Sequence, residues 1–240
     1  MINAIFNKRL LWLTLFSIAM GLLESAVVIY LRELYYPDGF AFPLQIVSRT
    51  VAITEFFREL ATLIMLMAVG YLTGKNLNQR FACFIYSFAI WDIFYYVFLY
   101  FIIGWPSSFL TWDVLFLLPT MWTGPVIAPI ITSLNMILLA LLILFFNEKN
   151  EKVKLLKRDW LMLTLGSLIV VAGFVQEFVF YLHNYFSWTE IILKMFSNNV
   201  LIFSMKFVPQ NFPWLTYSVG QGIIFFATIC YFYRSCKLRL

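Results

Sequence analysis

The sequence predicts an all-α, polytopic integral membrane protein, with six transmembrane helices in one bundle and short interfacial or re-entrant helices on the outer side. Three observations support this fold class. The chain of 240 residues is 62% hydrophobic and only 12% charged, whereas a soluble domain usually carries about 25% charged residues. Six apolar stretches are long enough to cross a bilayer, and basic residues gather in the connections on one side of them. We expect the whole chain, residues 1–240, to form a single transmembrane domain.

The six stretches follow from hydropathy and from the roughly 20 apolar residues that a spanning helix needs. The first resembles a signal peptide, because Lys8 and Arg9 precede an apolar run. That run continues past Glu24 to Tyr30, about 21 residues in all, so we expect an uncleaved first helix. The predicted spans are residues 10–31, 51–73, 81–103, 123–146, 160–182 and 214–233.

The orientation follows from the basic residues. Twelve of the 17 lysines and arginines lie before the first span, after the sixth, or in the connections that follow the second and fourth. The positive-inside rule places that side and both termini in the cytoplasm of a protein of the cell membrane. The net charge of +5 therefore indicates topology, and no nucleic-acid partner is expected. The twelve residues are Lys8, Arg9, Lys75, Arg80, Lys149, Lys152, Lys154, Lys157, Arg158, Arg234, Lys237 and Arg239.

The connections on the opposite side are long and rich in tryptophan, which anchors proteins at membrane interfaces. Segment 111–122 is too short to span, and Thr111 could cap a half-helix that Pro119 ends. This segment is either re-entrant or interfacial, and the interfacial arrangement is favoured. Segment 188–196 is a second candidate for an interfacial helix.

Each predicted span carries a polar residue at a similar depth. At 1.5 Å per residue, Glu24 lies about 21 Å and Asp92 about 17 Å from the cytoplasmic end of their helices. Polar residues of all six helices therefore fall between the midplane and the outer third of the bilayer. Intramembrane carboxylates are costly and usually face a bundle interior or an aqueous cavity. The candidate ligand-binding residues are Glu24, Glu55, Arg58, Glu59, Asp92, Asn135, Glu177 and Gln221.

The charges in this layer are unbalanced, because its carboxylates outnumber the single strong cation, Arg58. Either burial keeps some carboxyl groups protonated, or a bound cation supplies the missing charge. We expect Glu24, Glu59 and Asp92 to form the cation or metal site, with a divalent cation as the candidate cofactor. Asn135 and Gln221 would supply neutral ligands. The alternative is that these residues only make interhelical hydrogen bonds.

The sequence gives little support for other cofactors or for a known catalytic motif. His183 is the only histidine, which excludes a bis-histidine haem within this chain. It is a pH sensor, a lone metal ligand or, the favoured interpretation, an ordinary interface histidine. Nucleotide-binding and hydrolase motifs are absent, and no catalytic residue is assigned. The GYLTG sequence at 70–74 is a weak signal for close helix packing.

Three functions follow from these features. The leading expectation is an acidic site, open to the outer face, that binds and moves a cation, a proton or a cationic solute. The second is a membrane-embedded enzyme whose paired carboxylates act on a lipid or lipid-linked substrate, with a divalent metal as its candidate cofactor. The third is a non-catalytic subunit of a larger membrane complex. The expected partners are the lipid bilayer, a cation or lipid ligand, and other membrane subunits or further copies of this chain.

Overall fold

The computed structural model describes residues 2–118, 120–194 and 196–237 of the chain. Two residues used in the predictions, Pro119 and Arg239, lie outside these ranges. Within them, the chain forms eight helices and one two-stranded sheet. The helices are α1 (Ile2–Tyr35), α2 (Arg49–Thr73), α3 (Leu77–Ile103), α4 (Ile127–Lys149), α5 (Lys157–His183), α6 (Trp188–Leu193), α7 (Asn198–Met205) and α8 (Trp214–Lys237), and the strands are β1 (Trp112–Phe116) and β2 (Trp122–Pro125).

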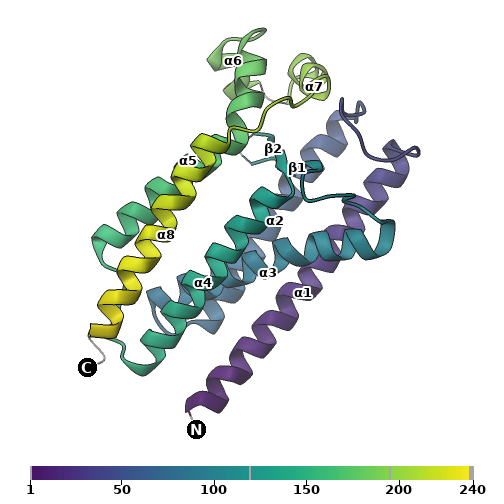
Figure 1. The fold of residues 1–240 in the computed structure, drawn as a ribbon. Helices are drawn as coiled ribbons and strands as arrows, with labels where there is room; N and C mark the ends of the chain where they lie inside the picture. Colours follow the sequence, from purple (N-terminus) through teal and green to yellow (C-terminus); the bar gives the residue numbers. More distant parts are fainter. Residues whose placement is uncertain (1, 119, 195, 238–240) are drawn as a thin grey trace.

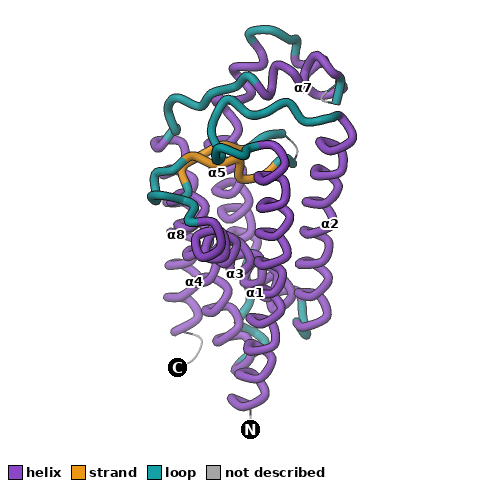
Figure 2. The backbone as a smooth tube through the Cα atoms, turned by 90° about the vertical axis from the view of Figure 1, so that its right-hand side faces the viewer, coloured by secondary structure: helices purple, strands orange, loops and turns teal. Residues whose placement is uncertain are grey.

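The long helices run along one another in an elongated bundle (Figure 1). Both chain ends lie at one end of it, which we call the terminal end. The strands, α6 and α7 lie at the opposite end, which we call the distal end (Figure 2). Within the described residues, α1, α3, α4, α5 and α8 are long and apolar enough to cross a membrane. The protein is therefore a helical, multi-pass membrane protein, as its composition predicts.

Every predicted span coincides with a long helix, but the second and fourth need comment. Helix α2 has 25 residues yet is not among the five candidate spans, so its crossing of the bilayer is not established. The fourth helix begins at Ile127 and not at residue 123, because Trp122–Pro125 forms a strand.

The predicted half-helix in segment 111–122 is wrong, because this segment contains most of a β-hairpin. Strands β1 and β2 pair antiparallel, with Trp112 opposite Pro125 and Asp113 opposite Gly124. The run WDVLF combines aromatic and β-branched residues, which favour strands. Pairing the two strands also satisfies backbone hydrogen-bonding groups where the hairpin is buried.

Segment 188–196, predicted as a helix, is helical over α6. Ser187 accepts a hydrogen bond from the Glu190 backbone N–H, and the Glu190 side chain accepts from Ser187 in return. This reciprocal capping box explains why the helix begins at Trp188. Whether α6 lies at a membrane interface stays a prediction.

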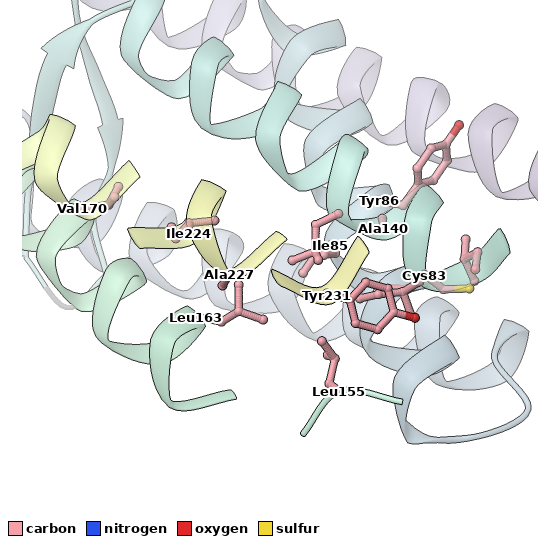
Figure 3. Packing of buried hydrophobic residues seen from close by; sticks show 14 of the residues in the cluster. Cys83, Ile85, Tyr86, Ala140, Leu155, Leu163, Val170, Ile224, Ala227 and Tyr231 are labelled. Carbon is pink, nitrogen blue, oxygen red and sulfur yellow. The ribbon is translucent and has the colours of Figure 1, made fainter. Parts of the chain in front are cut away.

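The bundle is held by an apolar core and by close approaches between helices. Buried side chains of α3, α4, α5 and α8 form the largest cluster, part of which is seen in Figure 3. At Gly70, in the GYLTG sequence, an added Cβ would lie 2.8 Å from the backbone nitrogen of Phe84. Helices α2 and α3 therefore pack closely there, as that sequence predicts.

Candidate functional site

A cavity of about 240 Å³ lies at the distal end, between α1, α2, α3, the hairpin and the segments that follow α5. We call it the distal cavity. Most of its lining is aliphatic or aromatic, which is typical of ligand pockets that hold an apolar body. Its polar lining residues are Arg32, Gln45, Glu55, Arg58, Glu59, Asp113, Thr120 and Ser204.

The first charged group of the cavity joins α1 to α2. Arg58 donates from Nη1 to Glu24 at 2.5 Å and from Nε to Glu55 at 2.9 Å. Glu55 and Arg58 are one helical turn apart and so share a face of α2. The three side chains are between 11% and 21% exposed, so their charges are only partly screened by solvent.

Glu59 lies one residue further along α2 and has a different partner. It is 7% exposed, and its Oε2 accepts a hydrogen bond of 2.7 Å from the backbone N–H of Leu117. This bond ties α2 to the segment that follows β1. Arg58 pairs with Glu24 and Glu55 and not with Glu59, so this corner of the cavity holds three carboxyl groups near one guanidinium.

The second charged group joins the end of α1 to the hairpin. Arg32 Nη2 lies 3.4 Å from Asp113 Oδ1. The guanidinium Cζ lies 4.5 Å from the Phe40 ring centroid and 3.7 Å from that of Trp105, distances at which cations attract aromatic rings.

Asp113 is 2% exposed and accepts long hydrogen bonds from Tyr95 at 3.5 Å and Tyr96 at 3.4 Å. Burial raises the pKa of Asp113 to about 6, although Arg32 and these hydrogen bonds act in the opposite direction. The carboxyl group is therefore mostly ionised at neutral pH.

The predicted polar layer is divided among several contacts. Of its residues, Glu55, Arg58 and Glu59 line the distal cavity, and Glu24 joins them through Arg58. Asp92 instead accepts a hydrogen bond of 2.8 Å from Ser133, which joins α3 to α4. Similar depth along the bilayer normal did not bring Asp92 to the cavity, because it faces a different neighbouring helix.

Asn135 and Gln221 also pair away from the cavity. Asn135 donates to Gln221 Oε1 at 2.7 Å, and Gln221 donates to Thr132 Oγ1 at 2.5 Å. These bonds join α4 to α8, and Tyr217 extends the network by donating to the Ala128 carbonyl at 2.7 Å. The arrangement matches the ordinary interhelical hydrogen bonds considered as the alternative.

The last two predicted residues lie near the end of α5. Glu177 Oε1 accepts from the backbone N–H groups of Gln210 at 2.7 Å and Asn211 at 3.1 Å. It therefore holds the segment before α8. The His183 ring stacks on Trp188, with ring centroids 4.3 Å apart, which fits an ordinary packing role.

The predicted metal site is not assembled. Among the described residues, no three histidine, cysteine, aspartate or glutamate side chains lie together so that they could hold a metal ion. Glu24 is engaged by Arg58, Glu59 by the Leu117 amide and Asp92 by Ser133. Each carboxylate thus has a protein partner on a different element.

Sequence reasoning missed Arg32 and Asp113. Asp113 is the only charged residue between Asp92 and Glu148, and a lone charge in so long an apolar stretch signals a specific partner. Arg32 follows Glu24 by eight residues and so lies near the same face of its helix. These two patterns could have indicated the pair.

No protein-family model, curated protein or solved structure matches this chain. The function must therefore be inferred from the site itself.

Proposed function

We propose that this is a cell-membrane protein with six spans, in which α2 also crosses and both termini are cytoplasmic. The twelve basic residues on the terminal side support this orientation. The α2 helix supports it too, since it connects a distal loop to a terminal one (Figure 2). A reporter active only outside the cytoplasm, fused after Leu240, should give no signal. A strong signal would reverse the topology.

We further propose that the distal cavity binds an amphipathic ligand, with an apolar body and a cationic or donor-rich head. The observation that carries this proposal is one cavity with mostly apolar walls and a corner where Glu24 and Glu55 pair with Arg58 and Glu59 follows it on α2. The apolar walls suit an acyl chain or a similar body. A cationic head would pair with the Glu55 carboxylate, which shares Arg58 with Glu24.

Binding is better supported than movement across the membrane. At the terminal end, a second cavity, lined by residues that include Arg9 and Cys83, measures about 10 Å³, room for roughly one water molecule. The helices of the bundle are joined by a large cluster of buried apolar side chains, part of which is seen in Figure 3. Transport would require the bundle to open along this core.

A membrane-embedded enzyme is the second candidate, and one observation favours it. The carboxyl groups of Glu59 and Asp113 and the hydroxyl group of Tyr95 belong to residues that line the same cavity. Carboxyl groups in such a setting can act as general acid and base on a bound lipid or lipid-linked substrate. Mass spectrometry of lipids incubated with the protein would reveal a new product if the cavity is catalytic.

The binding proposal can be tested on purified protein by native mass spectrometry. A long-chain amine should bind at least roughly tenfold more tightly than the alcohol of the same chain length, a difference of about 1.4 kcal/mol. Glu55→Gln keeps an acceptor for Arg58 Nε and removes a carboxylate, so it should erase much of this preference. Glu33→Gln, at an exposed position of α1, is the matched control. Equal binding of amine and alcohol to the wild type would overturn the proposal.

A further inference from the structure

Arg32 has a hydrogen-bond donor for which the described residues offer no acceptor. The residue is 8% exposed and lines the distal cavity. Its Nη2 faces Asp113, but its Nη1 is buried and has no acceptor within the described residues. A buried donor of a charged group is costly to leave unpaired, so native structures rarely do so.

The contacts around Arg32 show what it still needs. Phe40 and Trp105 lie close to the guanidinium, and aromatic rings offer it no strong acceptor. The distance of 3.4 Å to Asp113 is long for a charge-assisted hydrogen bond. Arg32 is therefore held in place while retaining capacity for a second, shorter contact with an oxygen acceptor.

Arg9 at the terminal end offers a comparison. Its Nε is also buried without an acceptor among the described residues. The cavity beside it measures about 10 Å³, enough for roughly one water. The cavity beside Arg32 measures about 240 Å³ and so has room for a much larger acceptor than water.

We propose that the head of the ligand also carries an acidic group, phosphate or carboxylate, which accepts a hydrogen bond from Arg32 Nη1. The ligand class is then a zwitterionic amphiphile, with its ammonium group toward Glu55 and Glu59 and its acidic group toward Arg32. This inference rests on the proposed binding function and adds the second polar contact. Guanidinium is well suited to phosphate and carboxylate, because its planar donors match their oxygens.

Three lipids with the same acyl chains distinguish this inference from the proposed binding function on which it rests. They are phosphatidylethanolamine, with both groups, a diacyl trimethylammonium lipid, with the cation alone, and phosphatidic acid, with the anion alone. In native mass spectrometry, the wild type should bind phosphatidylethanolamine roughly tenfold more tightly than the cationic lipid. Phosphatidic acid should bind most weakly, because it faces the acidic corner without a compensating cation.

The variants identify Arg32 as the source of the preference. Arg32→Gln should bind the cationic lipid as the wild type does and lose the advantage of phosphatidylethanolamine. Arg32→Lys keeps the positive charge and should retain only part of the preference. It replaces Arg32→Gln as the test if the glutamine variant fails to fold. Asp113→Asn should keep the preference, because it removes the internal partner and leaves the donor. Arg9→Gln, the same substitution at the terminal end, should leave the preference for phosphatidylethanolamine unchanged.

Several outcomes would overturn the inference. Equal wild-type affinity for the zwitterionic and cationic lipids would mean that water or a small ion satisfies Arg32. Equal loss of the preference in Arg32→Gln and Asp113→Asn would make Arg32 a structural partner of Asp113 only. Competition by inorganic phosphate at the same concentration as the lipid would mean that a free anion occupies the site. If the cationic lipid alone fails to bind to the folded wild-type protein, the proposed function itself is wrong.

Discussion

The two ends of the bundle contain the same kind of contact, arginine paired with carboxylate, around very different amounts of space. At the terminal end, Glu148 accepts from Arg9 at 2.7 Å and from Lys75 at 3.1 Å, which joins α4 to α1 and to the connection before α3. Arg234 donates from Nη1 and Nη2 to the two carboxylate oxygens of Asp159 and so joins α8 to α5. The cavity beside Arg9 measures about 10 Å³.

At the distal end, the pairs stand in the wall of a cavity of about 240 Å³. Glu24 and Glu55 pair with one arginine there, and the buried Nη1 of Arg32 has no acceptor among the described residues. A buried ion pair without space beside it can only join helices, whereas one in the wall of a large cavity has room to contact a ligand. If the proposed function is correct, the terminal end stabilises the bundle and the distal end recognises the ligand.

The largest expected effect is on stability at the terminal end. Asp159 is fully buried, and its loss would leave Arg234 without its carboxylate partner. Asp159→Asn should destabilise the folded protein by roughly 3 kcal/mol or more, because breaking a buried pair leaves a charge uncompensated. Thermal unfolding in detergent measures this, with Asp38→Asn at an exposed position as the control. Equal melting temperatures for the two variants would contradict the fastening role.

A smaller effect concerns pH at the distal end. Burial raises the folded-state pKa of Asp113 to about 6 from the ordinary value of 3.8. The folded state therefore binds its proton more tightly than the unfolded state, so this contribution to stability is present below pH 4 and is lost as pH rises through 6. A shift of about two pKa units corresponds to at most roughly 3 kcal/mol.

The Asp113 contribution is isolated by comparison with Asp113→Asn. The stability of the wild type relative to this variant should fall between pH 4 and pH 6 and stay level above that range. Denaturant unfolding at several pH values measures it. A relative stability that rises over the same range would mean that the Arg32 pair, and not burial, governs the Asp113 carboxyl group.

The smallest expected effect concerns Asp92, which belongs to neither end. Its side chain accepts from Ser133, and no lysine or arginine of the described chain forms an ion pair with it. Asp92→Asn keeps the shape and an acceptor oxygen, so stability should change by less than about 1 kcal/mol. Melting curves with and without divalent cations test this. A cation-dependent stabilisation of the wild type that the variant lacks would restore Asp92 as a metal ligand.

The helical part of the fold was largely predictable because long apolar helices follow from length and hydropathy, and each predicted stretch overlaps one of the six long helices. The hairpin was not, because an apolar run as short as WDVLF fits a helix or a strand equally well until its partner is known. Trp122–Pro125, the partner strand, looks like the start of a helix in the sequence alone.

The site was partly predictable. Glu55, Arg58 and Glu59 share a helical face, so spacing alone placed them together. Depth suggested Glu24, which contacts Arg58, and also Asp92, Glu177 and Gln221, which face other neighbours. Distance along a helix gives the level of a residue and not its direction around the axis, nor which helix stands opposite. Arg32 and Asp113 meet only through the hairpin, which the sequence did not predict.

Filling the distal cavity tests the central claim most directly. Ala52 on α2 lines the cavity, while Ala61 on the same helix is exposed on the bundle surface. Ala52→Trp should reduce the affinity for a long-chain amine at least roughly tenfold in native mass spectrometry, because the indole would occupy the space of the ligand. Ala61→Trp should bind as the wild type does. If Ala52→Trp elutes as a folded protein and binds the amine with unchanged affinity, the distal cavity is not the ligand site.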